Sequence, residues 1–199
     1  MVEHHTLPNG LGVDFYPETH TYVVNGIELP SITTLLKEVY GDTYSAVKPE
    51  LLKAASEYGT AVHNELQMVI EGFTSLDETQ YPETKNFFSY IMPRYNIKPV
   101  MTEKVVVLYD PSGKPVAAGR FDLLCEVNGK LTLADFKTTS AIHRQLVTAQ
   151  LNLYLIAAYQ SGYLDNKDLD LGVVHLHGST YEYKPMVKLN ENFYLKFII

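Results

Sequence analysis

Near the N-terminus, residues 11–30 alternate aromatic or β-branched side chains with polar ones. A period of two is typical of half-buried β-strands. The dipeptide Asn25-Gly26 interrupts the pattern and is the preferred sequence of a two-residue hairpin turn. The segment therefore predicts a small N-terminal β-meander. A helical pattern follows it, for which Ser31 or Thr33 is the candidate N-cap.

Two further segments in the first half of the chain have helical spacing. Residues 48–72 predict a long helix, with a proline near its first turn and a glycine just past its end. Gly59 lies inside this helix and costs about 1 kcal/mol relative to alanine. Residues 81–97 predict a second helix, which we expect to kink or end near Pro93 because proline cannot donate the helical hydrogen bond.

Beyond residue 99 the period returns to two. The predicted strands cover residues 100–110, 116–127, 130–139, 171–178 and 180–189. A helix over 141–162 lies between the third and fourth of these strands, and a last helix is expected over 190–199. This order predicts an α/β or α+β fold, with a mixed central sheet flanked by helices. We expect a single domain over residues 1–199, made of an N-terminal β-meander (1–30), a helical cover (31–98) and a core (99–190).

The composition is that of an ordinary globular chain, with 46% hydrophobic and 20% charged residues among 199. No window is apolar enough to span a membrane, and the N-terminus lacks the features of a signal peptide. The single cysteine, Cys125, excludes an internal disulfide framework and a four-cysteine zinc or iron–sulfur site. These features favour a cytoplasmic location. The net charge of −7 argues against a broad nucleic-acid-coating surface, but not against a local basic groove.

Three charged residues interrupt the predicted hairpin around the turn Asn128-Gly129. Asp122 lies in the first strand, and Asp135 and Lys137 lie in the second. With a period of two, Asp135 and Lys137 share a face and their Cα atoms are about 7 Å apart. The tight turn makes the strands neighbours, so Asp122 and Asp135 are expected to converge near one end of the hairpin.

The same period predicts which side chains of the first hairpin strand share a face. On one side we expect Phe121, Leu123, Cys125 and Val127. On the other side we expect Arg120, Asp122, Leu124 and Glu126.

Two converging carboxylates repel each other unless a cation lies between them. Mg²⁺ or Mn²⁺ would relieve this repulsion, because these ions bind carboxylates, water and phosphate. Lys137 would then hold an attacking water or stabilise negative charge. The alternative is an Asp–Lys ion pair at a sheet edge beside an ordinary turn carboxylate. Gln150 and Tyr154 share one face of the following helix and favour the metal site, although such a pair also occurs at the edge of a core.

Four motifs in this order resemble the PD-(D/E)XK nuclease superfamily, and specifically its RecB-like branch. The motifs are Gly119-Arg-Phe-Asp122, Asp135-Phe-Lys137, Gln150-x-x-x-Tyr154 and, upstream, Gly59 followed by His63. The segment "LPSITTLL" after a "VVNGIE" strand is similar to the opening of phage-encoded RecB-like exonucleases and of the mitochondrial genome maintenance exonuclease. The resemblance covers residues 20 to 177. It implies a restriction-endonuclease-like core.

The resemblance also implies metal and catalytic roles. Asp122 and Asp135 would bind the metal, with the Phe136 carbonyl as a further oxygen ligand. Lys137 would be the catalytic lysine. His63 would be an additional metal ligand, which suits Mn²⁺ better than an all-oxygen site does.

The remaining roles implied by the resemblance concern substrate and support. Gln150 would hydrogen-bond within the site. Tyr154 would contact a DNA phosphate or stack on a base, and Arg120 and Thr138 would also bind substrate. Glu103 matches a carboxylate one strand earlier, either as a second-shell residue or as a ligand.

Other aromatic and histidine residues carry weaker signals. The helices before the β-strands would cover a channel that admits a single strand of DNA. Four aromatic residues are either stacking platforms for its bases or core residues: Phe87, Phe88, Tyr90 and Tyr95. The histidines without a motif are interpreted as structural or surface residues: His143, His175 and His177.

The expected function is a metal-dependent DNA nuclease, most specifically a single-strand-preferring exonuclease in phage DNA recombination, replication or repair. One or two Mg²⁺ or Mn²⁺ ions would be its cofactors, with no iron–sulfur cluster. Its partners would be DNA with a free end and phage recombination or replication proteins, and no membrane. The alternatives are a structure-specific or flap endonuclease of the same fold, or a catalytically silent DNA-binding module.

Overall fold

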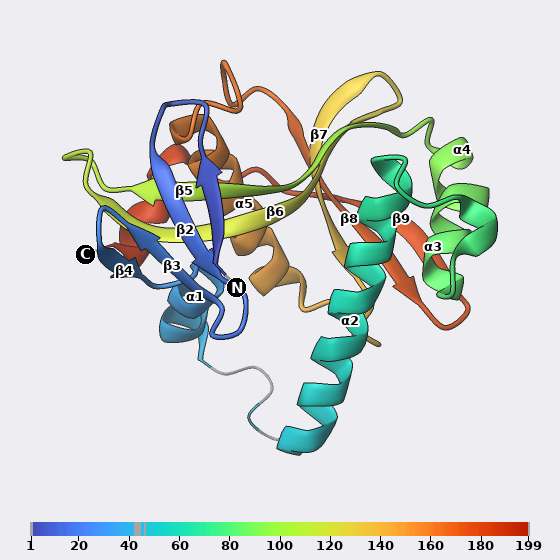
Figure 1. Ribbon diagram of the computed structural model, residues 1–199. Coiled ribbons are helices and arrows are strands. Elements are labelled where there is room, and N and C mark those ends of the chain that lie inside the picture. The colour runs from blue at the N-terminus through green and yellow to red at the C-terminus, as the bar shows by residue number, and fades with distance from the viewer. Residues whose placement is uncertain (1, 42–44, 46, 199) are drawn as a thin grey trace.

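The computed structural model describes residues 2–41, 45 and 47–198, which form two β-sheets with helices packed around them (Figure 1). The predicted domain limits at 1 and 199 lie outside these residues, as do positions 42–44 and 46 of the predicted helical cover. Within the described residues, no helix combines the length and the apolar character that a membrane crossing requires.

The first sheet is the predicted N-terminal meander. Its four antiparallel strands follow chain order: β1 (Glu3–Thr6), β2 (Gly12–Tyr16), β3 (Thr21–Val24) and β4 (Ile27–Leu29). At the turn between β3 and β4, Asn25 and Gly26 have φ angles of 50° and 76°. Two consecutive positive φ angles define the type I′ turn that this dipeptide favours.

The second sheet has five strands in chain order: β5 (Lys98–Tyr109), β6 (Pro115–Val127), β7 (Lys130–Lys137), β8 (Asp170–His177) and β9 (Thr180–Met186). β7 and β8 are parallel and the other neighbours are antiparallel. The parallel pair requires a crossover, which helix α5 (Arg144–Gln160) provides. The mixed sheet flanked by helices confirms the predicted fold class.

The other helices lie N-terminal to this sheet: α1 (Ile32–Tyr40), α2 (Pro49–Ile70), α3 (Pro82–Asn86) and α4 (Met92–Arg94). Ser31 is the N-cap of α1, because its Oγ accepts a hydrogen bond of 3.0 Å from the Thr34 N–H. A π-helical turn, Phe87–Ile91, joins α3 to α4, and the helical run ends at Arg94, one residue past Pro93. The expected last helix is a 3₁₀ helix over Glu191–Phe197, after a shorter one at Leu76–Glu78.

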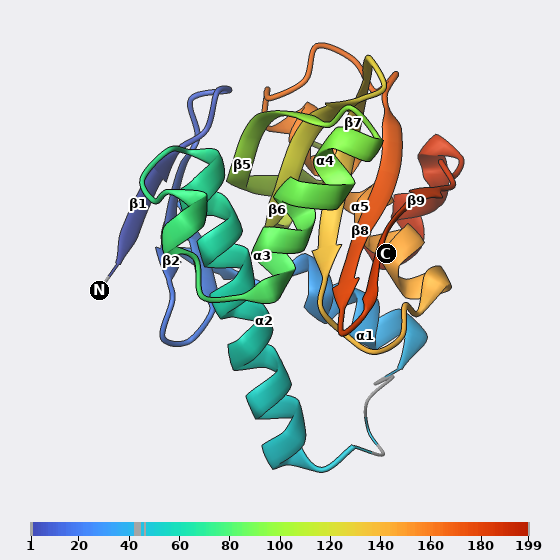
Figure 2. The same ribbon diagram turned by 90° about the vertical axis from the view of Figure 1, so that its right-hand side faces the viewer.

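The five-stranded sheet is covered on both faces (Figure 2). α1 and α5 pack on one face, which we call the back, against residues such as Val106 and Leu133. α2 and α3 pack on the opposite face, the front, against residues such as Ala134 and Phe136. The meander sheet also packs on the front, because Val105 belongs to its hydrophobic cluster. The site elements therefore come from both faces.

One predicted strand face is wrong. Phe121 packs at the back with the α5 cluster, whereas Leu123, Cys125 and Val127 pack at the front with the α2 cluster. The alternation of faces shifts at the intervening Asp122. In the neighbouring strand β5, Glu103 lies opposite this position with a φ of 49°, which is unusual for a non-glycine residue inside a strand. Asp122 lies beside this irregularity, and its Oδ2 is 3.6 Å from Nδ1 of His63 on α2.

Gly119 on β6 permits the closest approach of α5 to the sheet. A Cβ atom at this position would lie 2.8 Å from Cε1 of Tyr154 and 3.4 Å from its hydroxyl. Tyr154 is only 6% exposed, so its ring has little room to move away. The glycine of the Gly-x-x-Asp motif is thus required by packing in this structure.

We expect Gly119→Ala to lower the free energy of unfolding by about 1–3 kcal/mol, the usual cost of overpacking a core. Urea denaturation followed by circular dichroism measures this. Gly12→Ala in β2 is the matched control, because a Cβ there has no atom within 4 Å. Equal stability of the two variants would contradict the packing described for Tyr154.

Candidate metal centre

Three neighbouring strands each place one carboxylate at the same level of the central sheet. The register of β5 and β6 pairs the residues on either side of Glu103 with those on either side of Asp122, so these two stand opposite each other. The ladder between β6 and β7 ends one residue before Asp122 and Asp135, and the same register sets these two opposite each other. We call Glu103, Asp122 and Asp135 the carboxylate row. The predicted convergence of Asp122 and Asp135 is therefore present.

Asp122 lies at the centre of the row, where β6 and β7 separate. Its Oδ2 accepts a hydrogen bond of 2.7 Å from the Phe136 N–H. This side-chain bond takes the place of the next backbone hydrogen bond between β6 and β7, and it fixes the carboxylate between the two strands. The side chain of Asp122 is 11% exposed.

Asp135 and Lys137 form a pair on the back face, as their spacing predicts. The Lys137 Nζ lies 2.5 Å from Asp135 Oδ2 and donates to Gln150 Oε1 at 3.2 Å. Asp135 is only 3% exposed, so Lys137 compensates a buried charge. Gln150 on α5 thus hydrogen-bonds within the site, as predicted.

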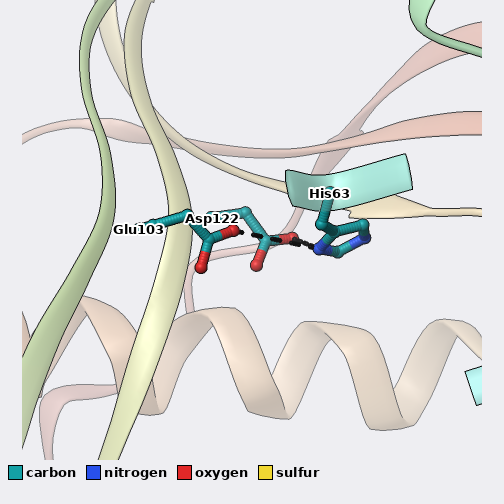
Figure 3. A group of neighbouring side chains, drawn as sticks. All are labelled: His63, Glu103 and Asp122. Atoms are coloured by element: carbon teal, nitrogen blue, oxygen red, sulfur yellow. Dashed lines mark ion pairs between the residues drawn. The ribbon is translucent and has the colours of Figure 1, made fainter. Parts of the chain in front are cut away.

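His63 reaches the row from α2 on the front face (Figure 3). Its Nδ1 lies 3.6 Å from Asp122 Oδ2 and 4.0 Å from Glu103 Oε1. The ring also contacts Phe136 edge to face, with the ring centroids 5.8 Å apart. One helical turn earlier, Gly59 brings α2 close to β7, because a Cβ there would lie 3.1 Å from Thr138 Oγ1. Gly59 thus allows the close approach that positions His63.

The ligand atoms of His63, Glu103 and Asp122 all lie within 4.8 Å of one another. Glu103, for which the sequence left two roles open, therefore belongs to the group. Asp135 is not part of it and is instead paired with Lys137. A ligand role for Asp135 and for the Phe136 carbonyl remains a prediction, while the geometry joins His63 and Asp122 as expected.

The carboxylates of the row are electrostatically strained without a cation. Burial, and next the charge of Asp122, raise the pKa of Glu103 to about 8. Burial likewise raises the pKa of Asp135 to about 6, although Lys137 opposes this shift and Asp122 adds to it. With its pKa raised to about 8, the Glu103 carboxyl keeps its proton near neutral pH. A divalent cation bound at this site would displace that proton.

The site opens into a cleft of about 410 Å³ between α2 and the meander sheet. The wall opposite α2 is made by the meander and the start of α1, and includes Phe15, His20, Tyr22, Ser31 and Thr33. These residues lie outside the motifs that mark the site in the sequence. No signal in the sequence could have shown them, because the packing of the meander beside the row is a long-range contact.

The predicted substrate-binding residues lie in or beside this cleft. Arg120 lies over the Phe15 ring at 4.7 Å and pairs with Glu3 at 2.8 Å between Nη2 and Oε2. Tyr154 lines the cleft, but its ring is too buried to stack on a base. Burial also raises the pKa of its hydroxyl well above the usual value. Thr138 lies against Gly59 on α2.

The histidines interpreted as structural support the loop after Lys137. His175 is buried, and its Nε2 lies 2.7 Å from the Thr139 carbonyl oxygen. The exposed His177 makes the same kind of contact from Nδ1 to the Thr138 carbonyl oxygen, also at 2.7 Å. His143 is exposed at the start of α5.

The aromatic residues of the predicted second helix lie outside the cleft. Phe87 is fully buried in the α2 cluster, against which Phe88 and Tyr95 pack. Tyr90 is exposed and stacks on Tyr181 of β9, with ring centroids 5.5 Å apart. Of the two interpretations of these residues, the structure supports a packing role.

Comparisons with known proteins add little to this geometry. A scan against protein-family models finds no match, and a search of curated proteins finds no significant match. Solved structures that align with the chain include the crystal structure of SSO0001, at 13% identity over 70% of this chain and 84% of that one. The TM-score of 0.37 is too low to support an inference about the site.

We expect His63→Ala and Glu103→Gln each to weaken Mn²⁺ binding, measured by isothermal titration calorimetry. The metal-free melting temperature at pH 7 should change little for His63→Ala. It should rise for Glu103→Gln, because the amide removes the unfavourable burial of a carboxylate beside Asp122.

The exposed residues His4 and Glu28 provide matched controls, His4→Ala and Glu28→Gln. Neither control should alter Mn²⁺ affinity. Wild-type affinity in His63→Ala would remove this histidine from the centre. A lower metal-free melting temperature in Glu103→Gln would show that Glu103 acts as a structural carboxylate.

Proposed function

We propose that this protein is a divalent-metal-dependent nuclease that hydrolyses phosphodiester bonds in DNA. The observation that carries the proposal is the carboxylate row with His63 on one side and the Lys137–Gln150 pair on the other. The four motifs that resemble RecB-like PD-(D/E)XK nucleases supply residues to this one place. A structural ion pair would account for Asp135 and Lys137, but not for Glu103, Asp122 and His63 as well.

The donor set fits Mg²⁺ or Mn²⁺. His63, Glu103 and Asp122 offer one nitrogen and two carboxylate oxygens, and a bound cation would oppose the burial and the Asp122 charge that raise the pKa of Glu103. The imidazole favours Mn²⁺ over Mg²⁺ in the usual order of affinities. When bound, the ion would neutralise charge on the scissile phosphate and make water a stronger nucleophile.

The protein itself would position the reacting groups. Asp135 pairs with Lys137, and the hydrogen bond to Gln150 holds the ammonium group on the back of the row. Held there, Lys137 would orient a water or stabilise negative charge that develops on the phosphate. The Phe136 N–H holds Asp122 in place, so its carboxylate needs no rearrangement when a cation binds.

The preferred substrate in this proposal is a single strand with a free end. The site residues lie inside a cleft, where the side chains of His63, Glu103 and Asp122 are 24%, 13% and 11% exposed. A strand whose phosphates can enter between α2 and the meander suits this geometry better than the surface of an intact duplex. Phage recombination, replication or repair is the proposed setting, and flap cleavage or silent DNA binding are the alternatives.

We expect Asp122→Asn to reduce cleavage of end-labelled DNA by more than about 100-fold, because Asp122 is a proposed metal ligand and removing even a hydrogen-bonding partner of a ligand costs about 10–100-fold. The amide oxygen can still accept from Phe136, so the fold should be retained. Strands labelled at the 5′ or 3′ end, with Mg²⁺ or Mn²⁺, provide the assay. Asp14→Asn on β2 is the control, and undiminished cleavage by Asp122→Asn would exclude this site.

A covalently closed single-stranded circle tests the requirement for an end. We expect the linear strand of the same sequence to be degraded while the circle persists, because only a free end can be fed into the cleft. Gel electrophoresis of both substrates in one reaction provides an internal control. Equal rates of cutting would identify an endonuclease. Tight binding without hydrolysis under either metal would favour the silent binding module.

A further inference from the structure

A second cavity lies on the back of the carboxylate row. It has a volume of about 230 Å³ and is enclosed by α1, the loop after β7 and the start of α5. Lys137 and Gln150, which belong to the proposed nuclease site, line one side of it. Thr33, in the first turn of α1, lines both this cavity and the cleft on the front. The cavity therefore borders the site through Lys137 and Gln150 and is separate from the metal-ligand group.

The lining of this cavity combines an apolar body with positive charge. Leu36 of α1 lies on one side, and Ile142 and Leu146 lie on the other. The charged and titratable side chains among the described lining residues are Lys37, Lys137 and His143, and none of them is acidic. The front cleft differs, because it includes Glu3, Glu103 and Asp122.

These properties select a flat, largely apolar group attached to an anion. The volume is below the roughly 300–1,000 Å³ of sites for drug-sized ligands, so it suits one ring system and not a stack of several. Enzymes that hold an unstacked base place it between aromatic or apolar side chains and give it a few hydrogen-bonding partners. Here the aliphatic walls would contact the faces of a base, and the Thr33 and Thr139 hydroxyls would reach its edge.

We propose that this cavity, the back pocket, binds one unpaired nucleobase of the nucleic-acid strand. The inference rests on the proposed nuclease function and adds a specificity-determining subsite to it. The nucleotide held there would be next to the phosphate that Lys137 contacts. A base still paired in a duplex cannot enter, so the back pocket would select single strands by requiring an unpaired base at one fixed position. Lys37 at its rim would attract the adjoining phosphate.

Abasic substitution tests the subsite directly. A set of single strands carries one abasic residue at successive positions from the labelled end. We expect one position to lower kcat/KM about five- to tenfold, the low end of the about 1–3 kcal/mol that a base stacked on an aromatic ring contributes, because the walls here are aliphatic. The effect should appear mainly in KM. Equal rates for every member of the set would overturn the proposal while leaving the nuclease assignment intact.

Filling the back pocket gives the complementary test. Leu146→Trp should lower kcat/KM on the intact strand to the value for the sensitive abasic strand, with no further loss on the abasic strand itself. Leu131→Trp, at an exposed position at the far end of β7, is the matched control. Leu146→Ala, which removes one wall without added bulk, should show a smaller loss in the same direction if the larger side chain prevents folding. Additive losses from protein and substrate changes would contradict the pocket.

A binding measurement in EDTA separates this inference from the proposed function. Deoxyadenosine 5′-monophosphate should shift the amide NMR signals of residues around Ile142 and Leu146 in the wild type. The shifts should be absent in Leu146→Trp and much smaller with 2-deoxyribose 5-phosphate, which lacks a base. These shifts, in a protein that cleaves no strand when Mg²⁺ or Mn²⁺ is supplied, would retain the back pocket and reject the nuclease. Equal shifts with both ligands, or none with either, would reject the pocket.

Discussion

The structure depends on a row of three carboxylates across adjacent strands of the central sheet. Like charges directly opposite one another destabilise a sheet, and burial increases the penalty. Two neighbouring groups partly relieve this repulsion. Lys137 pairs with Asp135, and the Phe136 N–H donates to Asp122. At Glu103, burial and the charge of Asp122 outweigh the opposing charge of Arg120, and its pKa rises to about 8.

The row divides the surrounding elements between two faces. On the front, α2 carries His63 toward Asp122 and Glu103, and Gly59 lets the helix approach closely enough. On the back, α5 carries Gln150 toward Lys137. Two helices from distant parts of the chain therefore converge on one level of the sheet. The backbone is irregular at this level, where Glu103 has a positive φ opposite Asp122.

Local signals in the sequence were sufficient for the part of the site within the hairpin. The Asn128-Gly129 turn fixes the register of β6 and β7, and this register brings Asp122 and Asp135 together. A period of two correctly placed Asp135 and Lys137 on one face, and the helix that directly follows them was expected to bring Gln150 to the same place, where it hydrogen-bonds to Lys137. Each of these inferences spans only a turn, a strand or a single crossover.

The rest of the site depends on contacts that the sequence does not encode locally. A regular period of two placed Phe121 on the wrong face of the strand, because the alternation shifts beside Glu103. No pattern in the sequence predicts the positive φ of Glu103. The place of the meander as a wall of the cleft follows from the packing of its core against Val105, Val107 and Ala118. These residues looked like ordinary strand positions, and only the tertiary arrangement shows that they hold the meander next to the row.

The two cavities that share Thr33 differ in the charge they present, and this difference follows from the row itself. The front cleft contains Asp122 and Glu103 together with Arg120, so a bound cation would strengthen its attraction for an anionic strand. The back pocket is lined by Lys37 and Lys137 and by no carboxylate among its described lining residues, and Lys137 is already paired with the buried Asp135. In the proposed enzyme, Lys37 would therefore attract the strand at the back before metal binds, while the cation would add attraction at the front. Asp135 holds Lys137 in place from the back face and lies outside the metal-ligand group.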